Sequence, residues 1–173
     1  RKIATALAER LSDIAPLPLD HPRAKLSAFA NPKVAHQLQS MIERHLKTPG
    51  AVDISNQVFG QPTLVESNGY TFLQPKVIYC TDPSHPLANT EMLFPFVSVV
   101  ETLQSEMLDQ IGSTLVATAL TKTQNWIDDL LHCSHIDRLN LGPIPTNQIS
   151  WDQPHEGNLF ELLYRQRAMQ AIA

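Results

Sequence analysis

Apolar residues recur every three or four positions in the first fifty residues, which is the spacing of one buried helix face. The first run predicts an amphipathic helix over residues 2–14, which ends at Ala15-Pro16-Leu17-Pro18 because proline cannot continue a helix. A second helix is predicted from Asn31-Pro32, since asparagine is a good N-cap and proline suits the first helical position, and Pro49-Gly50 ends it. The apolar positions are Ile3, Leu7, Leu11 and Ile14 in the first helix and Val34, Leu38, Ile42 and Leu46 in the second.

Strands and helices alternate in the middle of the chain. Short β-like segments are predicted around 51–55, 62–66 and 70–80. Strands then follow at 96–101, 115–120 and 136–141, with helices over 103–111 and 122–132 between them. This order is typical of an α/β fold, so we predict three parallel strands with flanking helices in a single domain, residues 1–173. Residues 142–157 predict a long ordered loop, and Asn158 with Glu161 is a capping signal for a last helix, 159–171.

Composition places the chain among ordinary globular proteins, with 43% hydrophobic and 17% charged residues in 173. The net charge of -4 and the lack of a basic cluster argue against nucleic-acid binding, which requires Lys and Arg to neutralise phosphates. No apolar run reaches the length of a membrane span, and two cysteines predict reduced thiols and a cytoplasmic location. Because the sequence opens on Arg1 rather than Met, we interpret it as an excised fragment.

Few residues are candidates for chemistry, and most of them have an ordinary structural interpretation. With six glycines the sequence contains no phosphate-binding glycine loop, and therefore no self-contained nucleotide-phosphate site. The run His132-Cys133-Ser134-His135 permits metal or thiolate chemistry, but it falls where a helix should end and lacks further ligands at zinc spacing, so capping is preferred. Cys80 has no evident base or positive neighbour, so we prefer a small buried residue to a nucleophile.

Glu91 and the loop 151–158 are the remaining candidates for ligand contact. A carboxylate at a loop-to-strand junction can accept hydrogen bonds from a ribose diol, although the residues alone favour a solvated charge or a local cap. The loop Trp151-Asp152-Gln153-Pro154-His155-Glu156-Gly157-Asn158 is rich in groups that line pockets. A pocket wall and a surface lid remain equally open interpretations of this loop.

Two runs carry a resemblance to a known family. Gly69-Tyr70-Thr71-Phe72-Leu73-Gln74-Pro75-Lys76-Val77, followed by Glu91-Met92-Leu93-Phe94-Pro95, resembles the aldehyde dehydrogenase signature of aromatic-Gln-Pro-Thr-Val leading to Glu-x-Phe-Gly-Pro. The flanking segments agree in order, and the resemblance covers nearly the whole chain. It implies the C-terminal portion of a parallel-sheet α/β catalytic domain in a divergent member.

The resemblance also implies roles for individual residues. Glu91 would bind the nicotinamide ribose of NAD or NADP, and Leu93 would occupy the position of an aromatic residue that packs near the nicotinamide. Phe94 replaces the family's Gly, which puts ordinary cofactor geometry in doubt. The family's Pro-Phe-Gly-Gly stretch is altered here, and Trp151 and His155 are the expected substrate-pocket residues for a small aldehyde.

The family's reactive groups would all precede this chain. Aldehyde dehydrogenases work through a Cys thiolate and a Glu-activated water, and neither Cys80 nor Cys133 matches the nucleophile. The segment alone is therefore expected to be inactive and not to bind NAD or NADP tightly. Two alternatives are a non-catalytic binding or assembly module on the same scaffold and, less favoured, a metal-binding protein using His132, Cys133 and His135. A homo-oligomer is expected, because an exposed sheet edge favours self-association.

Overall fold

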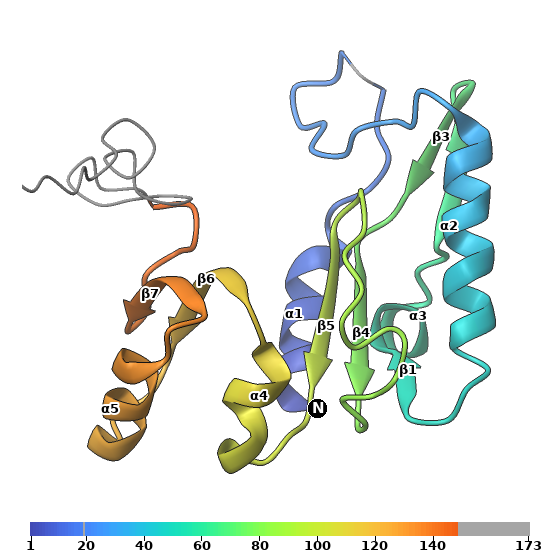
Figure 1. Ribbon diagram of the computed structural model, residues 1–173. Helices are drawn as coiled ribbons and strands as arrows, with labels where there is room; N and C mark the ends of the chain where they lie inside the picture. Colours follow the sequence, from blue (N-terminus) through green and yellow to red (C-terminus); the bar gives the residue numbers. More distant parts are fainter. Residues whose placement is uncertain (19, 149–173) are drawn as a thin grey trace, which may run out of the picture. The chain divides into compact units, whose positions relative to one another are not determined.

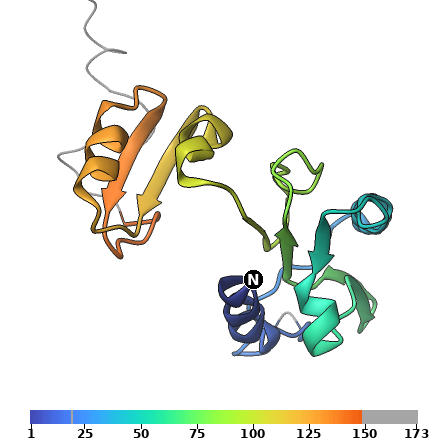
Figure 2. The ribbon, with the colours of Figure 1, turned by 90° about the horizontal axis from the view of Figure 1, so that it is seen from below.

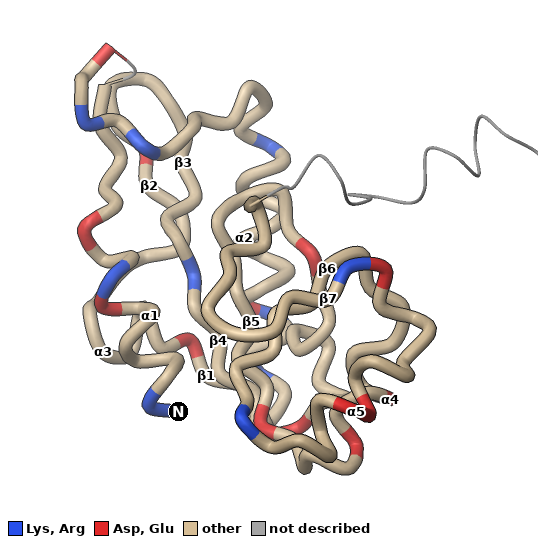
Figure 3. Tube along the Cα trace, turned by 90° about the vertical axis from the view of Figure 1, so that its left-hand side faces the viewer, with Lys and Arg blue, Asp and Glu red and all other residues tan. Residues whose placement is uncertain are grey.

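The computed structural model describes residues 1–18 and 20–148, which form two compact units. The N-terminal unit runs from Arg1 to Leu103, and the C-terminal unit begins at Gln104. Basic and acidic residues are interspersed along the trace (Figure 3). Within the described residues, no helix combines the length and apolar character needed to cross a membrane.

A three-stranded sheet with a fully buried central strand forms the middle of the N-terminal unit (Figure 1). Its order is β1 (Ala51–Asp53), β4 (Lys76–Cys80) and β5 (Phe96–Val100), with β1 antiparallel and β5 parallel to β4. All residues of β4 are buried, as expected for a strand covered on both faces.

Alternate side chains of β4 enter two separate apolar cores, as the two-residue period of a strand requires. The helices that cover them are α1 (Lys2–Ser12), α2 (Pro32–His45) and α3 (Ile54–Phe59). Ile78 and Cys80 pack in the core that includes α2, whereas Val77 and Tyr79 pack in the core that includes α1 and α3. Figure 2 shows α1 and α3 side by side.

The predicted helices of the first fifty residues are confirmed, and α2 begins at the predicted cap. The side chain of Asn31 accepts a hydrogen bond from the backbone N–H of Lys33 at 3.1 Å, and Pro32 opens the helix. The asparagine cap and the proline at the first helical position do not depend on packing, so both can be recognised in the sequence.

The strand predicted over 51–55 is wrong at its end, because the chain enters α3 at Ile54. Asp53 Oδ1 accepts the backbone N–H of Asn56 at 2.9 Å and caps this helix. Gly60 ends it in the left-handed conformation with φ of 64°, which favours glycine. A six-residue helix is too short to show a helical period in its apolar residues.

The β-like segment predicted over 70–80 is divided into two strands that join different partners. β3 (Tyr70–Leu73) pairs antiparallel with β2 (Leu64–Ser67), and β4 joins the central sheet after Gln74-Pro75. Asn68 and Gly69 form the hairpin turn with φ of 51° and 78°. Positive φ at both central residues is the requirement of a type I′ turn, which asparagine and glycine satisfy best.

The C-terminal unit is a parallel strand pair with a crossover helix. Its elements are η1 (Gln104–Glu106), α4 (Met107–Ile111), β6 (Thr114–Ala119), α5 (Gln124–His132) and β7 (Ile136–Leu141). β6 and β7 pair in parallel, and α5 connects them.

The sequence predicts parallel strands in this part of the chain, but not the neighbour of each strand. Parallel pairing is present, but β5 pairs with β4 and β6 pairs with β7. Alternation of strands and helices predicts strand direction, whereas the neighbour of each strand depends on tertiary packing. The apolar pattern therefore could not assign β4 as the partner of β5.

A buried ammonium group connects four segments of the N-terminal unit. Lys76 is fully buried, and its Nζ lies 3.0 Å from Asp53 Oδ2 and donates to the backbone carbonyl of Gln61 at 2.6 Å. The Gln61 amide in turn donates to the carbonyl of Ser12 at 3.0 Å. A charge removed from water requires such partners, because an unpaired one is strongly destabilising.

Replacing Lys76 with methionine is expected to lower the unfolding free energy of the N-terminal unit by about 3–5 kcal/mol, because Asp53 is left buried without its counter-ion. Urea titration followed by far-UV circular dichroism measures the change. The exposed Lys47→Met is the matched control, with an expected change within about 0.5 kcal/mol. The double variant Lys76→Met/Asp53→Asn, in which asparagine preserves the helix cap, should recover part of the lost unfolding free energy. No recovery would contradict the ion-pair argument.

A second polar contact in this unit, between Tyr79 and Glu101, predicts that its stability decreases at alkaline pH. The Tyr79 phenol donates a hydrogen bond to the Glu101 carboxylate, and that bond raises the pKa of Tyr79, with burial and the negative charge of Glu101 adding to the effect. Because the folded pKa exceeds the unfolded value of about 10, this stabilisation is present below about pH 10 and is lost as pH rises through the folded pKa.

Tyr79→Phe is therefore expected to flatten the alkaline loss of stability. Urea midpoints measured from about pH 8 to about pH 11 should fall more steeply in the parent chain than in the variant. Parallel curves for the two proteins would show that the Tyr79–Glu101 bond does not contribute.

Candidate functional site

The loop between β4 and β5, which carries Glu91, is held by internal hydrogen bonds. Asp82 Oδ1 accepts the hydroxyl of Ser84 at 2.7 Å and its backbone N–H at 2.8 Å, and these bonds lower the pKa of Asp82. The buried ring of His85 donates from Nε2 to the carbonyl of His45 at 3.2 Å and accepts a backbone N–H at Nδ1. The loop is thereby fixed to the end of α2 before it reaches Glu91.

Residues 91–94, which precede Pro95, include both exposed and core side chains. Glu91 is exposed and Leu93 is 85% exposed, whereas Phe94 is only 9% exposed. Phe94 belongs to the same core as Leu73 and packs edge-to-face on Phe96, with ring centroids 5.8 Å apart. Phe94 is therefore a core residue, and Leu93 is available to a ligand.

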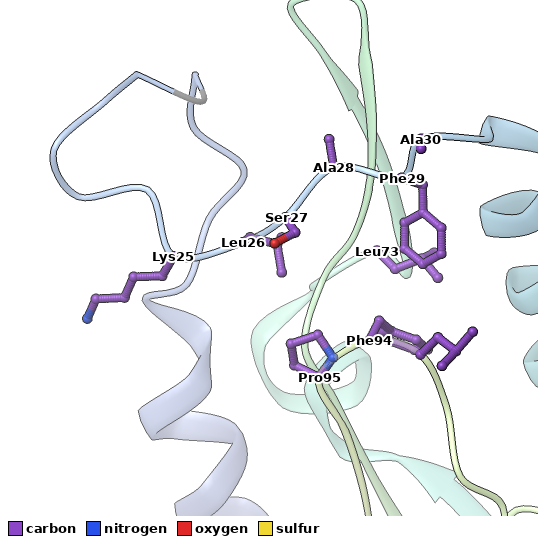
Figure 4. Close-up of a pocket in the computed structure, with 10 residues that line it drawn as sticks. Lys25, Leu26, Ser27, Ala28, Phe29, Ala30, Leu73, Phe94 and Pro95 are labelled. Atoms are coloured by element: carbon purple, nitrogen blue, oxygen red, sulfur yellow. The ribbon is translucent and has the colours of Figure 1, made fainter.

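A cavity of about 340 Å³ opens beside this segment. It is lined by residues 25–30 on one side and by Leu73 and the run Leu93-Phe94-Pro95 on the other (Figure 4). The backbone N–H of Phe29 donates to the carbonyl of Thr71 at 2.9 Å, which places the first wall against β3. The volume lies within the range of small-molecule pockets, roughly 300–1,000 Å³.

The lining of this cavity combines apolar and polar groups. Phe29, Leu73 and Phe94 contribute carbon atoms to the lining, whereas the side chain of Lys25, another lining residue, extends away from these three (Figure 4). Glu91 lies two residues before Leu93, outside the lining. An apolar surface with an exposed carboxylate close by in sequence can hold a flat ring and accept hydroxyl donors.

The two cysteines lie in different environments. Cys80 is fully buried, and burial with the nearby Asp82 charge raises its pKa, which confirms the interpretation of a small core residue. Cys133 is partly exposed, with its Sγ 3.2 Å from His135 Nε2. His132 instead contacts the carbonyl of Asp128, and no group of three metal-ligating side chains lies within the part of the chain that the structure describes.

The structure places only part of the predicted site. Glu91 and Leu93 lie together at the start of β5, while Trp151 and His155 are outside the described residues. Sequence reasoning missed the wall formed by residues 25–30. The Asn31-Pro32 cap fixes where this segment ends, but no pattern within it indicates a pocket.

No protein-family model matches the chain, and no curated protein sequence matches it. Solved structures do match. Lactaldehyde dehydrogenase from Escherichia coli aligns with a TM-score of 0.67 and 13% identity over 90% of this chain and 32% of that one. A 1-pyrroline-5-carboxylate dehydrogenase from Thermus, solved with bound NAD, gives 0.64 and 18% over 87% and 28%. Betaine aldehyde dehydrogenase from Staphylococcus aureus gives 0.60 and 15% over 83% and 29%.

The chain therefore has the fold of aldehyde dehydrogenases over most of its length, which confirms the predicted α/β class. The agreement holds at the level of fold, because the sequence identities are low. The chain spans about a third of the length of these enzymes.

Substitution at two adjacent positions should distinguish the exposed residue, Leu93, from the core residue, Phe94. Phe94→Ala is expected to cost about 3–5 kcal/mol of stability because it leaves a cavity in the core. Leu93→Ala, the matched control, should change stability by less than about 0.5 kcal/mol because the side chain is already in water. Urea unfolding measures both. A large loss at Leu93 would contradict its assignment to the solvent side.

Proposed function

We propose that this chain is the C-terminal part of the catalytic domain of an NAD(P)-dependent aldehyde dehydrogenase. The whole enzyme oxidises a small-molecule aldehyde to a carboxylic acid. The observation that carries the proposal is the shared fold over 90% of the chain, together with an exposed Glu91 and an exposed Leu93 that lines a cavity. Similar folds solved with bound NAD support a nicotinamide cofactor.

The exposed residues fit the proposed cofactor. The Glu91 carboxylate accepts hydrogen bonds from ribose hydroxyls, and Leu93 offers an apolar surface to a nicotinamide ring. Phe94, which stands where the family has glycine, packs its ring in the core against Phe96 and also forms part of the cavity wall. When bound, NAD or NADP supplies the hydride acceptor of the oxidation.

The covalent chemistry belongs to a cysteine outside these 173 residues. In the proposed mechanism that thiolate adds to the aldehyde carbonyl and forms a thiohemiacetal. Loss of hydride to bound NAD or NADP would convert it to a thioester, and water would hydrolyse the thioester to the acid and the free thiol. Cys80 is enclosed in the core, which supports its exclusion as the nucleophile. The segment alone is proposed to be inactive and to bind NAD or NADP weakly. Trp151 and His155 remain proposed substrate-pocket residues.

A non-catalytic binding or assembly module is the second candidate, and it is favoured by the replacement of the family's aromatic residue with Leu93. Titration of the full-length protein with NAD and NADP, followed by assay on a panel of aldehydes, distinguishes the two. Cofactor binding with turnover supports the enzyme. Absence of both, with stable self-association, supports the module and overturns the enzyme.

We also propose that the protein is cytoplasmic and homo-oligomeric. Its two free thiols support a reducing compartment, and exposed leucines in the C-terminal unit support self-association. Sedimentation over a range of concentrations tests the oligomer. A monomer at every concentration would overturn it.

Glu91→Gln in the full-length protein is expected to weaken NAD or NADP binding by about 1.5–3 kcal/mol, roughly tenfold or more in Kd, because a charged acceptor is lost. Isothermal titration calorimetry measures the affinity. Glu9→Gln, on an exposed face of α1, is the matched control and should leave the affinity unchanged. Equal affinities for the parent protein, Glu91→Gln and Glu9→Gln would contradict the assignment of Glu91 as a cofactor-binding residue.

A further inference from the structure

The C-terminal unit contains a thiol–imidazole pair that the proposed function does not use. Cys133 Sγ lies 3.2 Å from His135 Nε2, and Cys133 is partly exposed. Cys133 directly follows α5 and His135 directly precedes β7, so a short connection between regular elements holds the two side chains. A nucleophile within hydrogen-bond reach of a base is the arrangement of an activated cysteine.

A third group orients the imidazole. His135 Nε2 also lies 3.2 Å from the backbone carbonyl oxygen of Leu108 in α4. A carbonyl oxygen only accepts hydrogen bonds, so this contact stabilises the ring when Nε2 carries a proton. When the Cys133 thiol passes its proton to Nε2, the new N–H faces both the sulfur anion and the Leu108 oxygen.

Cys80 and His132 offer a comparison within the same chain, because Cys80 is a buried thiol and His132 is an imidazole that contacts a backbone carbonyl. Cys80 is fully buried, and no imidazole contact accompanies it among the described residues. His132 is adjacent to Cys133 in sequence, but its Nδ1 lies 2.7 Å from the carbonyl oxygen of Asp128. Proximity in sequence alone therefore does not define the pair; the contact with His135 does.

We propose that Cys133 is a nucleophilic thiol that forms mixed disulfides with low-molecular-weight disulfides. The Cys133 sulfur attacks one sulfur of the small disulfide, whose S–S bond breaks as a new S–S bond forms. The departing thiolate takes up the proton held on His135. One protein thiol and one small disulfide thus give one mixed disulfide and one small thiol. The site is a redox-sensitive modification site, and it does not rest on the proposed dehydrogenase function.

The test uses the intact chain and 2-hydroxyethyl disulfide, a small uncharged disulfide, with peptide mass spectrometry to follow each cysteine separately. Cys133 is expected to react faster in the folded protein than in the urea-unfolded protein at the same pH, because unfolding removes His135 from the sulfur. Cys80 is expected to react only after unfolding. Slower reaction of Cys133 in the folded protein overturns the proposal without any variant.

Two histidine variants complete the test. His135→Asn should lower the folded rate at Cys133 by about tenfold to a hundredfold and leave the unfolded rate unchanged. His132→Asn is the matched control and should leave both rates unchanged. An unchanged rate in His135→Asn, or equal losses in both variants, assigns the reactivity to general exposure or charge and overturns the proposal.

Discussion

The ammonium group of Lys76 is removed from water, and the N-terminal unit is arranged so that this charge has partners. The lysine stands at the start of the central strand, so its partners must come from the elements that cover that strand. Asp53 supplies the carboxylate from the junction of β1 and α3, and Gln61 supplies a carbonyl from the segment after α3. An ion pair is directional, whereas apolar packing tolerates several arrangements of similar volume. The pair therefore specifies where these segments meet.

The same residue connects the core to the candidate site through its backbone. Lys76 N–H donates to the carbonyl of Pro95 at 2.9 Å, and Lys76 stands opposite Phe96 in the parallel register. This contact fixes the segment immediately after Leu93 and Phe94. A slip of one residue would exchange the two faces of β5 and disturb the placement of Phe94 in the core.

Local signals explain which elements the sequence could predict. The cap at Asn31-Pro32 defines the start of α2 within the chain itself, so this helix was predicted correctly. The six-residue α3 has only two local signals, the cap at Asp53 and the glycine at its end. It is too short for its apolar pattern to indicate a helix, so the helix was not predicted. The partner of β5 and the pocket wall at residues 25–30 depend on contacts between distant segments. Periodicity contains no information about such contacts.

The residues of the candidate site also differ in whether the sequence alone could assign them. Glu91 and Leu93 could be proposed as site residues because the motif that contains them is continuous in sequence. The fate of Phe94 could not, since a phenylalanine in place of glycine can either block a ligand or fill a core. Only the position of Leu73 and Phe96 around its ring decides between these outcomes.

The described part of the C-terminal unit combines side-chain hydrogen bonds with exposed apolar residues. Arg138 donates from Nη1 to the carbonyl of Gln148 at 3.0 Å, and Asn140 donates to the Thr118 hydroxyl at 3.1 Å, so side chains of β7 hold the following loop and the neighbouring strand. A two-stranded sheet is marginally stable by itself, and here Leu120 is 76% exposed. Polar contacts cannot remove this apolar area from water, whereas an apolar partner surface can. The imbalance favours association through leucine-rich contacts over further hydrogen bonding within the unit.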